Sequence, residues 1–240
     1  TYDVVILADS PIGYWRLGDT TNTADDETDN SNDGTINAGV TKGVAALIGG
    51  DQDPCCNFNG ASGSVDMQSP ALLDDMFSGG GSLDAFINAN THGEGSSGRI
   101  LDKTQWELET FDESGGAMKL RFLHSFSSVV GEWVTTNRDI TVGTTHHIGL
   151  TYDRDAVGND PIFYVDGVAV AITENTTPVG TATSDASSNL LVGNNVADNG
   201  TFDGEIDEPA VYSGVLTAAQ MIAHYHAGLD NIIAGRWASR

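Results

Sequence analysis

The sequence predicts an all-β antiparallel sandwich that ends in one short amphipathic helix. Short, half-apolar stretches bounded by Gly, Asn, Asp or Pro recur along the 240 residues, and 29 glycines supply many turns. Only residues 216–228 instead carry apolar side chains at helical spacing. Sandwiches of this size are commonly one domain, so we expect a single domain at 1–230 and a C-terminal tail at 231–240.

The elements follow in order. The first 17 residues hold two apolar stretches, 4–7 and 14–17, separated by a Ser-Pro turn. Residues 19–34 form an acidic loop that is longer than an ordinary connection. Strands are then expected at 57–60, 64–66, 82–87, 98–102, 105–109, 118–123, 146–152, 162–165 and 189–192. The dipeptide Asp166-Gly167 predicts a tight hairpin turn into a further strand at 168–172.

The C-terminal segment has both helix-start and helix-end signals. Thr217 and Gln220 fit a capping box, in which each side chain satisfies a free N–H at the helix start. Gly228 stands where a left-handed C-cap is expected. We therefore expect this to be the only amphipathic helix of the chain.

The formal net charge is −24, from 34 acidic and 10 basic residues. So acidic a surface repels phosphates and anionic lipid, which excludes nucleic acid as a partner. No apolar run approaches the length of a membrane span, so membrane insertion is not expected either. Two compatible explanations of the acidity stay open: Ca²⁺ binding by carboxylates, and adaptation to high salt. Cys55 and Cys56 are adjacent and predict no structural disulfide.

Six segments in this order resemble the laminin-G-like, concanavalin A-like lectin/glucanase domains. They are 8–19, 33–35, 56–60, 146–153, 164–167 and 204–228. The resemblance implies a two-sheet jelly roll used mainly for binding glycans or proteins, often with a Ca²⁺ ion at the rim. It does not identify a ligand, because one fold supports many functions.

Glycoside hydrolases of this architecture carry a Glu-x-Asp-x-x-Glu strand. Glu205-Ile-Asp207 begins that motif, but Pro209 and Ala210 stand where the final carboxylate should fall. The stretch 107–112 imitates the motif less well. Without a general acid the chain is not expected to be an enzyme.

The acidic loop contains the best candidate for a metal site. Asp29, Ser31 and Asp33 occupy the first, third and fifth positions of a Ca²⁺-loop pattern, and Gly34 follows at the turn. The expected Glu at position twelve is absent. We expect Asp207 to complete the site, because the family's rim ions lie near that segment, with Asp19 as a second candidate. The alternative is a solvated, Asx-rich loop without an ion.

Ligand-binding candidates come from aromatic residues and rim loops. Trp106 and Trp133 are flanked by polar or turn-rich segments and could stack on sugars, although core packing is the commoner role. His92 lies in a Gly- and Ser-rich loop at 88–98, and Asn195 lies in the loop 194–200. Loops at the ends of a sandwich are where binding surfaces usually form.

The histidines show no metal-binding spacing. His146 and His147 are adjacent on a strand, so one should face the core and the other outward. His224 and His226 are two apart on a helix and do not share a face. Each pair is therefore expected to be structural.

We expect a non-enzymatic, surface-displayed module that binds a glycan or an envelope partner through its rim loops, outside the cell or on a virus particle. The alternative is a structural subunit of a virion or surface layer with no glycan ligand of its own. Either setting is compatible with a homo-oligomer.

Overall fold

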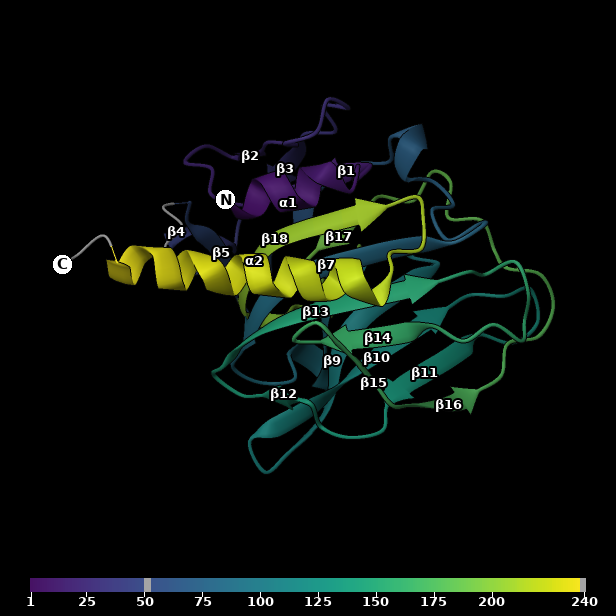
Figure 1. Cartoon of the computed structure of the whole chain (residues 1–240). Helices are drawn as coiled ribbons and strands as arrows, with labels where there is room; N and C mark the ends of the chain where they lie inside the picture. The colour runs from purple at the N-terminus through teal and green to yellow at the C-terminus, as the bar shows by residue number, and fades with distance from the viewer. Residues whose placement is uncertain (50–52, 238–240) are drawn as a thin grey trace.

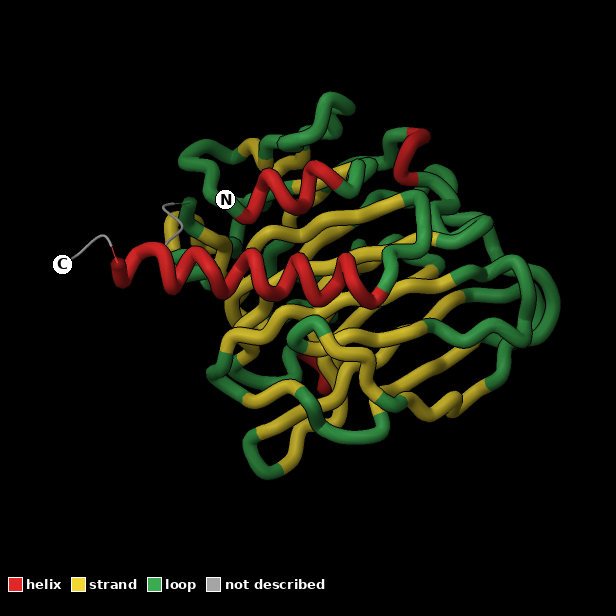
Figure 2. Tube along the Cα trace, in the orientation of Figure 1, coloured by secondary structure: helices red, strands yellow, loops and turns green. Residues whose placement is uncertain are grey.

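The computed structural model describes residues 1–49 and 53–237, and these form two antiparallel sheets packed face to face with two helices on one side (Figures 1 and 2). All ladders between strands in this part of the chain are antiparallel, which confirms the predicted sandwich. Among these residues no helix has the length and apolar character needed to cross a membrane.

The first sheet has eight strands. In spatial order they are β15 (Val168–Val170), β14 (Ile162–Val165), β13 (Thr145–Tyr152), β7 (Gly81–Ala89), β18 (Asp203–Tyr212), β5 (Cys55–Asn59) and β4 (Thr41–Val44), with β1 (Gly13–Tyr14) paired to β18. The central strands β7, β13 and β18 are buried along almost their whole length, on both faces.

The second sheet has ten strands. In spatial order they are β16 (Ile172–Thr176), β11 (Gly131–Thr135), β10 (Ala117–His124), β9 (Trp106–Ser114), β8 (Ser97–Asp102), β17 (Leu191–Val192), β6 (Val65–Asp66), β3 (Gly34–Ile36) and β2 (Thr23–Ala24), with β12 (Ile140–Thr141) paired to β10. Buried and half-buried residues alternate strictly along β10, the pattern of a sheet with one face in the core.

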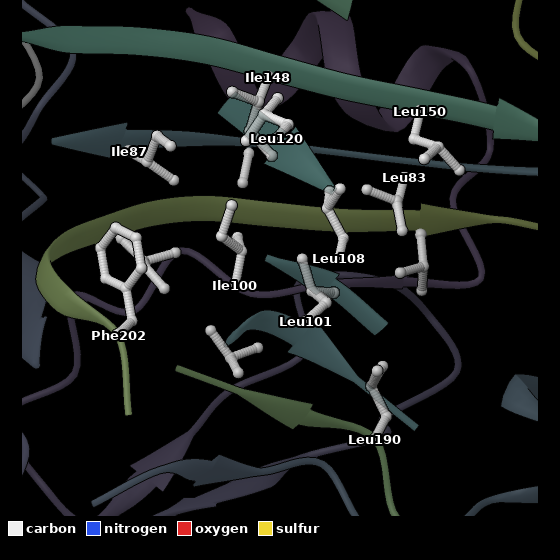
Figure 3. Packing of buried hydrophobic residues seen from close by; sticks show 14 of the residues in the cluster. Leu83, Ile87, Ile100, Leu101, Leu108, Leu120, Ile148, Leu150, Leu190 and Phe202 are labelled. Atoms are coloured by element: carbon white, nitrogen blue, oxygen red, sulfur yellow. The ribbon is translucent and has the colours of Figure 1, made fainter. Parts of the chain in front are cut away.

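The main core lies between the two sheets. Figure 3 shows Leu83 and Ile87 of β7 pointing toward Leu108 and Leu120 of the opposite sheet, and all four are fully or almost fully buried. Burial of this continuous apolar layer is the main source of stability.

The predicted hairpin at Asp166-Gly167 is confirmed. Both residues have positive φ, and Val165 pairs directly with Val168, as a two-residue turn of this type requires. The strand expected at 168–172 divides, however. β15 ends at Val170, and the chain then crosses to the second sheet as β16.

The expectation of a single helix is wrong. The apolar stretch at 4–7 belongs to a helix, α1 (Tyr2–Ala8), in addition to α2 (Ala218–Trp237) and two short 3₁₀ turns at Ala71–Leu73 and Glu94–Ser96. Tyr2 and Ile6, one helical turn apart, are buried against the outer face of the eight-stranded sheet, while Val4 is 62% exposed. Figure 1 shows α1 and α2 side by side over that sheet.

The capping box at the start of α2 is confirmed, but the predicted C-cap is wrong. The Gln220 N–H donates to Thr217 Oγ1 (3.3 Å) and the Thr217 N–H donates to Gln220 Oε1 (2.9 Å). Gly228 lies inside the helix, which continues to Trp237; residues 238–240 of the expected tail lie outside the described residues. A Cβ at Gly228 would overlap the Phe86 ring, so this glycine allows the helix to approach the sheet.

A buried lysine joins three segments at one end of the sandwich. The Lys103 ammonium is fully buried and donates to Asp74 Oδ1 (2.9 Å) and Asp185 Oδ1 (3.0 Å). Asp185 is also buried and accepts from the Trp106 indole (2.9 Å) and the Asp75 N–H (2.7 Å). The Lys103 ammonium therefore links the loops around 74 and 185, which Arg154 also joins through Asp75 and the Thr183 carbonyl.

Lys103→Met should lower the free energy of unfolding by about 3–5 kcal/mol, because it leaves Asp185 buried without its countercharge. Lys119→Met is the matched control: Lys119 lies 3.9 Å from Asp112 at a more exposed position, and its loss should cost less than about 1 kcal/mol. Denaturant unfolding measures both values. Equal effects would show that the buried network does not hold these loops.

Gly228→Ala should lower stability by about 1–3 kcal/mol through overlap with Phe86. Helix propensity alone would give the opposite result, a gain of about 1 kcal/mol. Thermal unfolding distinguishes the two signs, and a stabilised variant would mean that α2 can move away from the sheet at no cost.

Candidate functional site

A polar groove of about 300 Å³ lies beside β3, β6 and β17 of the second sheet. Its polar lining comes from Asn37, Ser64, Asp66, Asn189, Asn195 and Asp198. These side chains come from four separate segments of the chain, brought together by the pairing of β6 with β3 and β17. The predicted ligand-binding residue Asn195 is part of this groove.

Internal hydrogen bonds fix the carboxylates of the groove. Asp66 accepts from the Asn189 amide with both oxygens (3.0 Å each) and from the Gln68 N–H (2.8 Å). Asp198 Oδ1 accepts from the Asn194 amide (2.6 Å) and the Gly63 N–H (3.3 Å). Asp198 Oδ2 makes no hydrogen bond within the described part of the chain and offers acceptor sites to a ligand.

The loop 194–200 is held in shape before any ligand arrives. The Asn194 side chain is fully buried, where it donates to Thr201 Oγ1 (2.8 Å) and accepts from the Asn195 and Gly200 N–H groups. Asn195 is tied to Asn199 by two hydrogen bonds. Such a loop loses little conformational entropy on binding.

An apolar residue completes the groove. Val196, the third residue of this loop, is 74% exposed and lines the groove. An apolar patch beside amide and carboxylate groups matches the two kinds of surface that a sugar presents, C–H faces and hydroxyls. The groove can therefore bind a polyhydroxylated ligand by hydrogen bonding and packing.

The two predicted rim loops adjoin each other. Glu94, in the loop 88–98, accepts from the N–H and the hydroxyl of Thr201. The neighbouring His92 is half-buried and paired with Glu113 at 3.0 Å. His92 does not line the groove, so the structure separates it from Asn195.

The two tryptophans predicted as sugar platforms lie in the core. Trp106 is 1% exposed and packs edge-on against Phe77. Trp133 is fully buried, stacks on Phe122 and donates to Asp160 Oδ1 (2.7 Å). Neither ring has a face open to a ligand, so this prediction is corrected to core packing.

The acidic loop is organised by Asp26 rather than by the predicted metal ligands. The Asp26 carboxylate accepts from the N–H groups of Tyr14, Thr28 and Asn32, and its own N–H donates to Asp33 Oδ1. The hydrogen bond from the Thr28 N–H to Asp26 forms an Asx turn. The local sequence Asp26-x-Thr28 is typical of this turn, whereas the spacing of metal ligands does not reveal it.

The predicted ligands Asp29, Ser31 and Asp33 are exposed on this loop. Asp19 is half-buried and accepts from the Asp25 N–H (3.1 Å). Repulsion from Asp19, then burial and the charge of Asp33, raise the pKa of Asp25. These three carboxylates thus lie close enough to affect one another.

Asp207 does not join them. It is buried on β18 and accepts from the Leu47 N–H at 2.8 Å. Among the described residues, no three of Asp19, Asp29, Asp33 and Asp207 bring carboxylate oxygens within 4.8 Å of one another. Among the described residues, the predicted ligands therefore do not form a compact cluster of three carboxylates.

The carboxylates that imitate a hydrolase motif have structural partners. Glu205 accepts from Asn57 (3.1 Å), and Glu208, in a bulge of β18, accepts from the Tyr14 hydroxyl and from Arg16. Glu109 of the second imitation is fully buried between Arg99 and Arg121. These contacts assign the carboxylates to ion pairs and hydrogen bonds of the fold.

Comparison with solved structures finds the same sandwich in binding domains. The binding domain of Paraclostridial Mosquitocidal Protein 1 aligns with a TM-score of 0.67 at 14% identity, over 91% of this chain and 52% of that chain. The receptor binding domain of botulinum neurotoxin C/D mosaic serotype aligns at 0.63 and 11% identity, over 91% and 51%. This chain thus spans about half the length of these two structures.

Domain 4 of AbnA, a GH43 extracellular arabinanase from Geobacillus stearothermophilus solved in complex with arabinotriose, aligns with a TM-score of 0.59 at 19% identity, over 90% of this chain and 98% of that one. At these identities the likeness establishes the fold alone. No curated protein sequence matches the chain.

The sequence matches a family described as the concanavalin A-like lectin/glucanases superfamily over residues 59–221, which is more than half of the chain. This match confirms the resemblance found in the sequence and agrees with the two-sheet sandwich and its C-terminal helix. The chain therefore belongs to the concanavalin A-like lectin/glucanases superfamily.

Proposed function

We propose that this domain is a non-catalytic module that binds a glycan in the groove around Asn195. The observation that carries the proposal is the preorganised lining of that groove, where fixed amides and carboxylates stand next to the exposed side chain of Val196. Fixed polar groups beside an apolar surface favour polyhydroxylated ligands over purely apolar ones.

The structural relatives support a binding role. Two of them are binding domains of toxins, and a third is a domain of an arabinanase solved with an oligosaccharide. A glycan-binding module acts where glycans are displayed, so we propose a location outside the cell or on a particle surface. A subunit of a virion or surface layer without a glycan ligand is the alternative.

Calcium binding stays part of the proposal. It is supported by the mutual repulsion of Asp19, Asp25 and Asp33, which a divalent cation would relieve. The ion would stabilise the acidic loop, whose predicted ligands are not among the residues that line the groove.

Asn195→Ala should weaken glycan binding by about 5–20-fold, the cost of about one hydrogen bond together with loosening of the loop. A glycan array that includes arabinotriose, read in high salt with and without chelator, identifies the ligand, and titration calorimetry then gives the affinity. Asn137→Ala, at an exposed position of another loop, is the matched control and should bind like the wild type.

Equal affinities of Asn195→Ala and the wild type would show that the glycan does not bind in the groove. If the array shows no binding and the protein is recovered as a subunit of a particle or oligomer, the alternative function is correct. Loss of stability in chelator would assign an ion to the domain, and unchanged stability would remove Ca²⁺ from the proposal.

We also propose that the acidic surface is adapted to high salt. A chain with a net charge of −24 repels itself most when screening is weak. The Tm should therefore fall as NaCl is lowered from about 1 M to about 0.01 M, over which the Debye length grows from about 3 Å to about 30 Å. A neutral osmolyte at matched osmolality should not restore it, and a constant Tm would contradict the proposal.

A further inference from the structure

One histidine from each of the two pairs meets a buried aspartate beneath α2. Asp84 comes from β7, His147 from β13 and His224 from α2, and all three side chains are fully buried. One ligand atom from each lies within 4.8 Å of the other two. Asp84 Oδ2 is 2.6 Å from His224 Nδ1 and 3.3 Å from His147 Nε2.

The fold builds this cluster from segments that are far apart in sequence. β7 pairs with β13 so that Asp84 lies opposite Gly149, and α2 covers this part of the sheet (Figure 1). A Cβ at Gly149 would overlap Met221 of α2, so the glycine allows the helix to lie close to the strand. His224 is one turn further along the helix and reaches Asp84 from above the sheet.

The cluster requires a positive charge. Asp84 is fully buried, and one of its oxygens faces a ring nitrogen of both His224 and His147. An ionised carboxylate in the interior must be compensated. Two kinds of cation fit between it and the imidazoles, a proton on a ring nitrogen or a metal ion bound by both rings.

The second coordination sphere of a metal site is already present. His224 uses Nδ1 toward Asp84, and its other ring nitrogen, Nε2, lies 2.9 Å from Asp9 Oδ2. A carboxylate that accepts the second N–H of an imidazole is the usual partner of a metal-binding histidine, because it fixes the tautomer and the ring orientation.

The hydrogen bonds of the cluster are incomplete without a cation. Both imidazoles converge on one oxygen, Asp84 Oδ2, whereas Asp84 Oδ1 and His147 Nδ1 are buried without a hydrogen-bond partner among the described residues. Unsatisfied polar atoms of this kind are rare in protein interiors and point to an additional ligand.

We propose that Asp84, His147 and His224 bind a divalent transition metal ion, with Zn²⁺ the best match, and that this ion fastens α2 to the eight-stranded sheet. Two imidazoles and a carboxylate are ligands that Zn²⁺ prefers. Ligand atoms around tetrahedral Zn²⁺ lie about 3.3 Å apart, which the Asp84–His147 distance matches. The Asp84–His224 distance of 2.6 Å would lengthen when the ion binds. Complete burial indicates a structural ion rather than a catalytic one.

The experiment is to express the full chain in medium supplemented with Zn²⁺ or Co²⁺, so that the ion is available during folding, and to measure metal per chain by mass spectrometry. We expect one ion per wild-type chain, visible d–d absorption for Co²⁺, and a higher Tm than that of protein prepared with chelator. His147→Gln should lose the stoichiometric ion and the Co²⁺ spectrum. His226→Gln, at an exposed position of the same helix, is the matched control and should keep both.

Asp9→Asn keeps the test decisive if His147→Gln does not fold, because Asp9 lies at the edge of the cluster, with its side chain 22% exposed. It should lower metal affinity by about 10–100-fold with the fold intact by circular dichroism. Wild-type protein that folds without a stoichiometric ion would overturn the proposal and leave a protonated histidine as the compensating cation. Equal metal content in the wild type and His147→Gln would overturn it as well, by placing the ion elsewhere.

Discussion

The centre of the eight-stranded sheet is buried on both faces, and the rest of the structure depends on this constraint. In an ordinary antiparallel sandwich the outer face of each sheet meets water. Here α1 and α2 cover that face, so the outward-pointing side chains of β7, β13 and β18 are buried as well. A polar side chain at such a position must find its partner inside the protein. Asp84 contacts His224 of α2, His147 contacts Asp84 of β7, and Glu208 accepts from Tyr14 and Arg16, in the segment after α1.

Features with a local cause could be predicted from the sequence, and features set by tertiary packing could not. The hairpin at Asp166-Gly167 and the capping box at Thr217 depend on a few adjacent residues, and both are present. The role of Gly228 depends on Phe86, which lies 142 positions earlier, so a helix-end rule misread it. The β-branched run in α1 favours an extended strand by local propensity. Its helical structure is explained by burial of Tyr2 and Ile6 against the sheet, which the local sequence does not show.

The same distinction applies to the candidate site. Asn195, which the structure places in the groove, is predicted by the rule that rim loops carry binding residues, and this rule needs only the strand pattern. Asp66 and Asn189, which line the groove, are hydrogen-bonded although they lie 123 positions apart in the sequence. Neither segment by itself predicts this pairing. Trp106 and Trp133 show the opposite error. Successive side chains of a strand point to opposite faces, so polar neighbours flank an inward-facing ring as readily as an outward-facing one. Sequence spacing also gives no sign of the histidine cluster, since its two histidines, His147 and His224, come from different pairs.

The groove and the histidine cluster lie in different layers, which makes their functions physically separable. The groove is lined from the second sheet and its loops, whereas Asp84, His147 and His224 lie between the first sheet and α2. The apolar core between the sheets separates them by about 10 Å or more. An ion under α2 would therefore stabilise the scaffold without contributing a ligand to the groove.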